Sequence, residues 1–453
     1  MKTFLIILTC IFLMTLSYGN EINWHRYEAQ TISYVQNYLR IDTTNPPGNE
    51  NKAVYYLEKV LKEAGIKTIK FEPVKGRGVL YAKLYGNGEK RPLILTHHMD
   101  VVPAEKEKWT VPPFSGEIKH GYVWGRGAID MKTMGMIHLM LLKILKENNI
   151  KLNRDIIFLA VCDEESDSLG MRWFVKNKKE LIKDAEFAIN EGETITVTEG
   201  KPDFYGISTG EKSPLWIEMT AHGEPGHASK PAPDSAVLRL IRALNRIINV
   251  PDKVKLTKTV EIYLTKVGYA NLREMLDDPA GVAQVLSNPY TRALLTNTIS
   301  ITQLKGSNKI NSHPNTASAG LDCRLLPGEK PENFMSYIKE IVKDNKITFQ
   351  IKLQEISAES RPDTELFRVI KQVALKREPN AVVLPVMLTS SNDNHYLREL
   401  GITTYGFEPY RLGKGEDRSH GNDERISVEN VKFALRFLFE VLCNLGQIEK
   451  TQN

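Results

Sequence analysis

Acidic and histidine side chains follow three apolar runs of the chain, and their types could bind metal ions. The first run ends in His97-His98-Met99-Asp100, the second in Asp163-Glu164-Glu165 and the third in Asn190-Glu191. Apolar runs bounded by turn signals are typical of buried strands in a mostly parallel sheet. Catalytic groups of such sheets gather beyond the carboxyl ends of the strands. Imidazole and carboxylate donors in this position would suit zinc, cobalt or manganese.

Of the two adjacent histidines, His98 is the better candidate ligand. Neighbouring residues of a strand point to opposite faces of the sheet, and only His98 has a carboxylate two residues further on, Asp100. A carboxylate behind a ligating imidazole fixes its tautomer and raises its basicity. We therefore expect His98 to bind metal, Asp100 to support it and His97 to be structural.

Each remaining candidate metal ligand, taken alone, could also be an ordinary cap, turn or loop residue. Asp130 follows a loop with Gly125 and Gly127, where an aspartate is often only a helix cap or turn residue. The three acids at 163–165 would repel one another unless a cation lay nearby, although a solvated acidic turn is the alternative. Adjacent acids can also divide labour, with one binding metal and another transferring a proton. His420 precedes the last expected helix, in a loop where a lone histidine usually has no special role. The combination of these motifs carries the prediction.

These residues require an α/β scaffold to bring them together. Helical periodicity at 24–39 and 51–64 is followed by strand-like and helical segments that alternate to about residue 190, which predicts a mostly parallel sheet covered by helices on both faces. From about 206 the order becomes strand, helix, strand, strand, helix, strand, which is typical of a ferredoxin-like unit. We therefore expect a catalytic domain in two parts, 20–205 and 357–453, with an inserted domain at 206–356. The stretch 252–297 is longer than such a unit needs.

Composition and the N-terminus limit the classes of function. With 453 residues and 42% hydrophobic composition, the chain can bury a full core. Its 60 basic and 55 acidic residues form no concentrated basic stripe, so nucleic acid is not an expected partner. Lys2, the apolar stretch 4–16 and small residues up to Gly19 predict a signal peptide over 1–19. We expect a secreted or periplasmic protein with no stable membrane association, with an uncleaved membrane anchor as the alternative.

Beyond Cys10, which lies in the predicted signal, the chain has only Cys162, Cys323 and Cys443. None belongs to a Cys-x-x-Cys pair, so at most one disulfide can form, and three buried thiols are the simpler expectation.

In this order, the motifs resemble the signatures of the dinuclear zinc metallopeptidases. That family includes aminoacylase, acetylornithine deacetylase, succinyl-diaminopimelate desuccinylase and the glutamate carboxypeptidases. The resemblance covers roughly residues 24–445, including the inserted domain. It is carried by His98-x-Asp100-Val101-Val102-Pro103, Gly125-Arg126-Gly127-x-x-Asp130-Met131-Lys132, Asp163-Glu164-Glu165, Asn190-Glu191-Gly192, Gly226-His227 and His420.

The resemblance implies a zinc-exopeptidase-like catalytic domain with a lid that serves dimerisation, and a role for each motif. Asp130 would bridge two ions, with His98 and Glu191 completing one site and Glu165 and His420 the other. Glu164 would be the general base.

Three further residues lie in the inserted domain. His227 resembles the family's oxyanion-stabilising histidine, which in dimeric members reaches the partner's active site. Asn311 and Arg324 resemble residues that contact the substrate carbonyl or carboxylate. The segment 391–394 departs from the family pattern, which usually begins with glycines and threonine, so its substrate contacts stay open.

The expected activity is metal-dependent hydrolysis of an amide or peptide bond next to a free carboxylate, in a short peptide or an N-acyl amino acid. The implied cofactors are two divalent ions, zinc first, with cobalt or manganese as alternatives. A possible homodimer would form through the lid. The competing hypothesis is an exported metal-binding relative that binds peptides or amino acids without hydrolysing them. A serine hydrolase lacks support because the chain has no Gly-x-Ser-x-Gly elbow.

Overall fold

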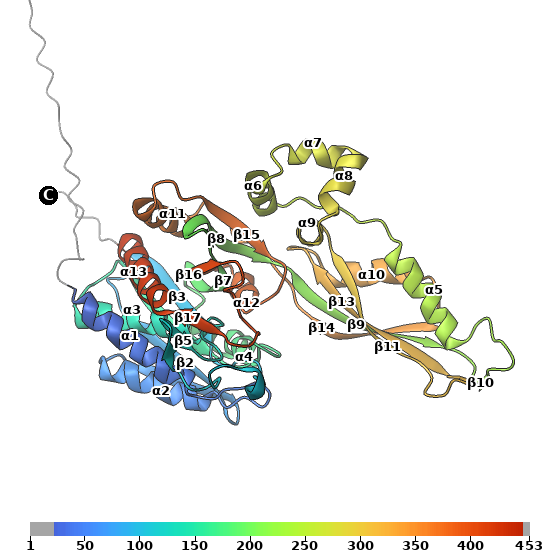
Figure 1. Ribbon diagram of the computed structural model, residues 1–453, viewed down its shortest axis with the longest axis horizontal. Helices are drawn as coiled ribbons and strands as arrows, with labels where there is room; N and C mark the ends of the chain where they lie inside the picture. Colours follow the sequence, from blue (N-terminus) through green and yellow to red (C-terminus); the bar gives the residue numbers. More distant parts are fainter. Residues whose placement is uncertain (1–21, 447–453) are drawn as a thin grey trace, which may run out of the picture.

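A sheet of eight strands forms the centre of the larger domain in the computed structural model, which describes residues 22–446 (Figure 1). The strand order is β1-β2-β6-β3-β7-β16-β8-β15. The strands are β1 (Thr68–Val74), β2 (Arg77–Leu84), β3 (Lys90–His98), β6 (Arg154–Val161), β7 (Phe187–Thr198), β8 (Lys201–Glu211), β15 (Val383–Leu388) and β16 (Thr403–Gly413). The central neighbours β6, β3, β7 and β16 run parallel, so their carboxyl ends meet at one edge. The predicted mostly parallel α/β fold is confirmed.

Helices cover both faces of this sheet, as the alternating pattern predicts. One face packs against α1 (Trp24–Leu39), α2 (Asn51–Glu63), α3 (Lys132–Glu147), α11 (Glu365–Arg377) and α13 (Val428–Leu445). The other face packs against α4 (Leu169–Lys178) and α12 (Asn394–Glu399). The helix α3 has no exposed face, because every residue from Lys132 to Leu145 is buried. It is enclosed because α1, α2, α13 and the sheet all contact it.

The smaller domain is an antiparallel sheet with two helices on one face. Its strands are β9 (Ser213–His222), β11 (Thr298–Lys305), β13 (Thr316–Leu325) and β14 (Ile347–Gln354), and its helices are α5 (Ala236–Ile248) and α10 (Pro331–Val342). The spatial order β11-β13-β9-β14 is that of a ferredoxin-like fold. We call this domain the lid. Its distal tip carries the short paired strands β10 (Gly226–His227) and β12 (Ser312–His313), and Figure 1 shows this tip far from the eight-stranded sheet.

Four short helices fill most of the stretch 252–297, which exceeds the length that a ferredoxin-like unit needs. They are α6 (Lys258–Val267), α7 (Leu272–Asp277), α8 (Pro279–Leu286) and α9 (Pro289–Leu295). They share a small apolar core with Leu326 of the lid and Met387 of β15. We call them the helical insert. It therefore packs on both domains, and Figure 1 shows it above the junction between them.

The chain passes from the large sheet to the lid between Glu211 and Ser213 and leaves the lid sheet at Gln354. The boundary expected after residue 205 falls inside β8, which stays in the eight-stranded sheet to Glu211. The lid sheet begins at Ser213 and ends at Gln354, and the catalytic domain resumes with α11.

Smaller elements complete the description. They are a sheet of β4 (Ile118–Lys119), β5 (Tyr122–Trp124) and β17 (Arg425–Ser427), and the 3-10 turns η2 (Lys106–Lys108) and η3 (Lys179–Leu181).

The predicted signal peptide lies outside the described residues. Within 22–446, no helix combines the length and hydropathy that a membrane crossing requires. Cys162, Cys323 and Cys443 are free and buried.

Candidate metal centre

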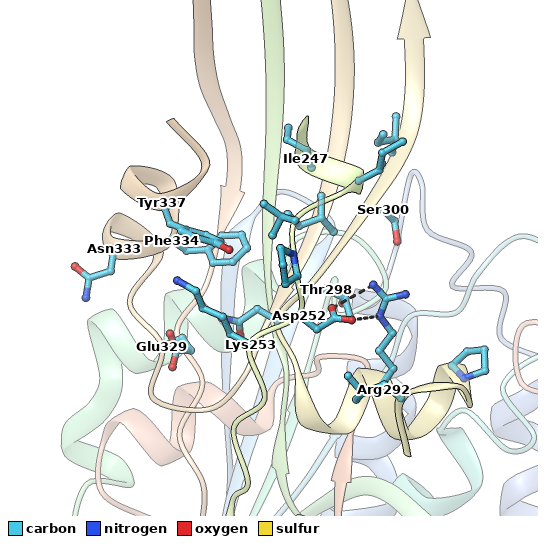
Figure 2. Close-up of a pocket in the computed structure, with 18 of the residues that line it drawn as sticks. Ile247, Asp252, Lys253, Arg292, Thr298, Ser300, Glu329, Asn333, Phe334 and Tyr337 are labelled. Atoms are coloured by element: carbon cyan, nitrogen blue, oxygen red, sulfur yellow. Dashed lines mark hydrogen bonds and ion pairs between the residues drawn. The ribbon is translucent and has the colours of Figure 1, made fainter. Parts of the chain in front are cut away.

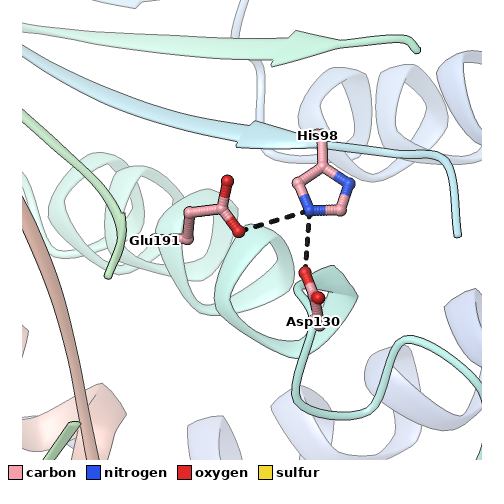
Figure 3. A group of neighbouring side chains, drawn as sticks. All are labelled: His98, Asp130 and Glu191. Atoms are coloured by element: carbon pink, nitrogen blue, oxygen red, sulfur yellow. Dashed lines mark hydrogen bonds and ion pairs between the residues drawn. The ribbon is translucent and has the colours of Figure 1, made fainter. Parts of the chain in front are cut away.

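Two groups of possible metal ligands share one aspartate. His98, Asp130 and Glu191 form the first group, and Asp130, Glu165 and His420 form the second. In the first, the His98 Nε2 atom lies 3.0 Å from Asp130 Oδ1 and 3.5 Å from Glu191 Oε2 (Figure 3). In the second, His420 Nε2 lies 3.0 Å from Asp130 Oδ2 and 2.9 Å from Glu165 Oε2. Each carboxylate oxygen of Asp130 thus faces a different group.

Different local structures deliver these side chains to one edge of the sheet. His98 is the last residue of β3, and Glu165 lies four residues beyond the end of β6. Glu191 lies within β7 rather than at its end. Its position is special because the ladder to β16 is irregular there: Asn190 pairs with Gly406 but Glu193 pairs with Phe407. Such a bulge redirects a side chain while the strand continues.

Backbone hydrogen bonds hold the Asp130 loop in place. The buried Glu424 carboxylate accepts the N–H groups of Gly127 (2.9 Å), Ile129 (2.7 Å) and Asp130 (3.1 Å). It also accepts a 2.7 Å bond from the Arg126 guanidinium. A loop fixed by several charge-assisted bonds presents its aspartate in one orientation.

Asp100 supports the centre in a different way from the one expected. The His98 Nδ1 atom lies 3.0 Å from the Asp100 backbone carbonyl and 3.7 Å from its carboxylate. Because a carbonyl only accepts, Nδ1 donates and Nε2 is left facing Asp130. The Asp100 carboxylate instead accepts the N–H groups of Glu164 and Glu165, each at 3.1 Å, and a 2.7 Å bond from the Asn45 amide. Asp100 thus orients the acidic segment as well as His98.

The three consecutive acids have separate surroundings. Asp163 is tied to the scaffold by Arg77 (2.6 Å) and Asn45 (2.8 Å). Glu165 faces His420 across the second ligand group. For Glu164, burial and then the Glu191 carboxylate raise the pKa well above its usual value. Only Glu164 is therefore left with a strongly perturbed carboxyl and no ligand partner, which is the state expected of a proton-transferring group.

The electrostatics of the groups favour bound cations. Burial raises the pKa of Glu191 and of Glu165, and the charge of the nearby Asp130 carboxylate raises both further. The hydrogen bonds that the protonated His420 ring donates to Asp130 and Glu165 raise its pKa to about 10. Although burial opposes it, Glu191 and its neighbours raise the pKa of His98 well above its usual value. Divalent ions between these groups would balance the charges of the carboxylates, and two imidazoles with three carboxylates suit zinc, cobalt or manganese.

His97 lies outside the ligand groups. It is buried, and its Nε2 atom is 3.2 Å from the Tyr38 hydroxyl. Its ring also closes over Gly135 of α3, where an added Cβ would lie 2.0 Å from it. His97 therefore has a packing role in the structure.

The lid residues lie away from the ligand groups. His227 is exposed on β10, with its Nδ1 atom 2.7 Å from Ser229 Oγ. Asn311 is exposed in the adjoining loop, where its carbonyl accepts the Ala228 N–H. Arg324 lies on β13 in an ion pair with Asp322 at 2.8 Å. Among the described residues, none of these three is hydrogen-bonded or ion-paired to a member of either group.

Other buried polar groups beside the centre were not predicted. The side-chain amides of Asn392 and Asn394 donate to the Glu191 carbonyl at 3.4 and 3.2 Å. Between them, Asp393 is buried, and burial raises the pKa of its carboxyl well above the usual value. These residues belong to the segment 391–394. Its departure from the family pattern was the only feature of the sequence that could have drawn attention to them. Glu408 of β16 is also buried, and a charged residue within an apolar run could have marked it.

Comparison with known proteins identifies the family. A family model described as peptidase family M20/M25/M40 matches residues 94–444. The chain belongs to this family. The resemblance to dinuclear zinc metallopeptidases is thereby confirmed, and the chain is a metal-dependent hydrolase of peptide or amide bonds.

Relatives and solved structures agree with this assignment. Aminoacylase-1A of Rattus norvegicus is 27% identical over 406 residues, covering 88% of this chain and 91% of the relative. A probable carboxypeptidase S-like 2 of Dictyostelium discoideum is 28% identical over 381 residues, covering 78% and 72%. The M20 metallo-carboxypeptidase Sso-CP2 of Sulfolobus solfataricus has a TM-score of 0.71 at 21% identity, covering 92% of this chain and 99% of its own. The last of these comparisons shows a common fold.

Proposed function

We propose that this M20 hydrolase cleaves an amide or peptide bond next to a free carboxylate, in short peptides or N-acyl amino acids. The observation that carries the proposal is the sharing of Asp130 between two ligand groups, one oxygen to each. His98 and Glu191 would hold one divalent ion, and Glu165 and His420 the other. Bound there, a pair of ions, zinc first, supplies the Lewis acidity that lowers the pKa of a water molecule.

In this proposal Glu164 moves the proton. Its buried carboxylate, which has no ligand partner, would accept a proton from the attacking water and then return it to the leaving amine nitrogen. The Asp100 carboxylate accepts the Glu164 N–H at 3.1 Å, which fixes the backbone that carries the base. Such proton transfer contributes about 10²–10⁴ in rate.

We also propose that the lid completes the site from a second copy of the chain. His227 is exposed at the distal tip of the lid. Among the described residues, no hydrogen bond or ion pair joins it to the metal-ligand groups of its own chain. In a homodimer it could stabilise the developing oxyanion of the other protomer, as charge-stabilising donors do elsewhere. Arg324 and Asn311 are the proposed substrate contacts of the lid. Light scattering during size-exclusion chromatography tests this, because a strict monomer would contradict a contribution between protomers.

The proposed location is secreted or periplasmic, after removal of the segment 1–19, with an uncleaved signal anchor as the alternative. Mass spectrometry of protein from the producing cell tests it. An intact N-terminus in the membrane fraction would favour the anchor.

The decisive test of the activity combines an amine-release assay with a variant of the proposed base. Purified protein should release free amine from dipeptides or N-acyl amino acids, and a chelator should abolish the release. Glu164→Gln should keep the bound metal and lose about 10²–10⁴ in kcat. A matched control is Glu63→Gln at the end of α2, where no change is expected. Full activity of the Glu164 variant would remove the proposed base. Metal binding without any amine release would favour the non-hydrolytic alternative.

A further inference from the structure

Two chain crossings join the lid to the catalytic domain, and each has a glutamate on its catalytic side. Glu211 is the last residue of β8, two residues before the lid sheet begins at Ser213. Glu355 directly follows Gln354, where the lid sheet ends. The crossings are bonded to each other, because the Glu355 N–H donates to the Pro214 carbonyl at 3.1 Å. A rotation of the lid must therefore turn the backbone that carries these two glutamates.

Both carboxylates contact one short segment of the catalytic domain, residues 391–398, which we call the coupling segment. Glu355 accepts a 3.0 Å hydrogen bond from the Ser391 hydroxyl. Glu211 forms a 3.1 Å ion pair with Arg398 of α12, and both of these side chains are almost fully buried. Figure 1 shows α12 next to the junction of the two domains. The coupling segment is thus attached to both crossings.

The same segment contacts a proposed metal ligand. The side-chain amides of Asn392 and Asn394 donate to the Glu191 carbonyl at 3.4 and 3.2 Å. The Asn394 N–H donates to the Asn392 side-chain oxygen at 3.0 Å, which fixes the two amides relative to each other. Within the described sheet, Glu191 has no paired residue in β3 or β16, so these amides hold its backbone where the ladder is irregular. A shift of the segment would therefore move the Glu191 carboxylate relative to His98 and Asp130.

The coupling segment is enclosed too tightly to absorb a movement of the crossings. Asn394 is 0% exposed, His395 2% and Arg398 6%. The His395 Nδ1 atom donates to the Asn392 carbonyl at 2.7 Å, which ties the helix to the residues before it. Close-packed interiors transmit displacements because they contain little free space. We therefore expect the segment to move as one body.

We propose that the two crossing glutamates and the coupling segment position Glu191, so that the orientation of the lid sets the affinity of the first ligand group for its ion. The inference rests on the proposed function, because it takes Glu191 as a metal ligand. Such coupling is reciprocal: if the lid contacts strengthen ion binding, the bound ion strengthens the lid contacts by the same factor. Among the described residues, no hydrogen bond or ion pair joins the segment to Glu165 or His420, so the second group should be independent of the lid.

The cavity between the lid and the helical insert takes no part in this connection. Figure 2 shows it near the ends of α5 and α10, with a volume of about 590 Å³. Its lining residues lie between 247 and 337, and none of them belongs to the crossings or to the coupling segment. Its ion pair, between Arg292 and Asp252 at 3.0 Å, also lies within the lid and the insert. The connection from the lid to Glu191 therefore passes through the crossings.

Zinc binding in single-site backgrounds tests the connection. His420→Ala keeps the group of His98 and Glu191, and His98→Ala keeps the other group. In the His420→Ala background, Ser391→Ala should raise the Kd of zinc by about 3- to 10-fold, the net contribution of one hydrogen bond. In the His98→Ala background, the same change should leave the Kd unaltered. Isothermal titration calorimetry measures both values, and Ser336→Ala on the exposed face of α10 is the control.

Non-additivity separates positioning from a general loss of stability. The double variant Asn392→Ala/Asn394→Ala removes both amides from the Glu191 carbonyl and should raise the Kd of zinc by about 10- to 100-fold in the His420→Ala background. Adding Ser391→Ala to it should have no further effect, because the connection is already broken. Ser391→Thr, which keeps the hydroxyl, should bind zinc like the background.

The reverse effect should be visible at the crossings. In the His420→Ala background, zinc should slow amide hydrogen exchange in residues 355–360 by about 3- to 10-fold, because a bound ion and the lid contacts support each other. Ser391→Ala should remove this protection. Glu211→Gln, which weakens the other crossing, should reduce it.

Four results would overturn the connection. They are an equal rise of the Kd in both backgrounds, no change in either, full additivity with the double amide variant, and exchange at the crossings that zinc leaves unchanged. An equal rise would instead assign the contacts to the general stability of the domain. Absence of zinc binding by the unaltered protein is a different outcome, because it would reject the proposed metal centre itself.

Discussion

The metal centre and the tip of the lid differ in how firmly their residues are held. Asp130 lies in a loop whose N–H groups bind a buried carboxylate, and His98 is bonded to the backbone of Asp100. The His227 side chain, in contrast, is exposed, and among the described residues it hydrogen-bonds only with Ser229, two residues away. Residues fixed by many buried contacts can act within their own chain, whereas residues on an exposed tip need a further surface to become ordered. The comparison contrasts a centre whose residues are held within one chain with a lid tip that would gain contacts in the proposed homodimer.

Removal of the shared carboxylate should break the centre and leave the lid intact. Asp130→Asn takes a charged ligand from both groups at once, so we expect both ions to be lost and activity to fall by more than about 10³-fold, beyond the 10–100-fold cost of losing a supporting partner. Metal analysis and amine release measure this. Asp277→Asn, an exposed change on the insert, is the control. An active variant with two bound ions would contradict the shared role.

The support of the Asp130 loop should matter nearly as much. Glu424→Ala leaves the Arg126 guanidinium buried without its 2.7 Å partner and frees the loop N–H groups. Breaking a buried pair in this way costs about 3–5 kcal/mol in the free energy of unfolding. Urea unfolding measures the loss, with the exposed Glu274→Ala as control. A loss below about 1 kcal/mol would show that the loop is held by other contacts.

The lid tip should show the opposite behaviour. His227→Ala should leave the free energy of unfolding unchanged, because the side chain is exposed, yet lower kcat by about 10²–10³ if the histidine stabilises an oxyanion. His313→Ala, on the strand paired with β10, is the control and should keep kcat. An unchanged kcat for the His227 variant, or a loss confined to KM, would argue against that role.

The pH dependence of stability should separate the metal-free and metal-bound forms. The pKa of His420 is raised to about 10 by Asp130 and Glu165. Because this value lies above the usual value of about 6.5, its contribution is fully present below pH 6.5 and is lost as the pH rises towards 10. Metal replaces the proton, so the gain in Tm on adding zinc should increase over that pH range. A gain that is constant or falls with pH would contradict this linkage.

The sequence predicted the centre best where a strand ends at a ligand. His98 could be found because β3 ends on it, and Glu165 because the apolar run of β6 ends just before it. Glu191 was predicted for the same reason, although β7 in fact continues beyond it through a bulge that no local pattern marks. His420 became a candidate only through the order of the motifs, because a histidine in a loop has no periodicity.

Other features depend on contacts between distant segments. The Asp100 carboxylate binds backbone N–H groups 64 and 65 residues away, which no spacing rule indicates. The helical insert has short helices that each bury only a few residues, so the sequence shows little periodicity there. The first part of the catalytic domain extends to Glu211, beyond the expected boundary at 205, because β8 continues in the large sheet after the apolar pattern changes.

Anomalous diffraction from crystals grown with zinc tests the central claim most directly. The account predicts two peaks per chain about 3.5–4 Å apart, as in other two-metal sites. One should contact His98 and Glu191, the other Glu165 and His420, and both should contact Asp130. A single peak, or two peaks of which one lies away from Asp130, would contradict a centre built around that carboxylate.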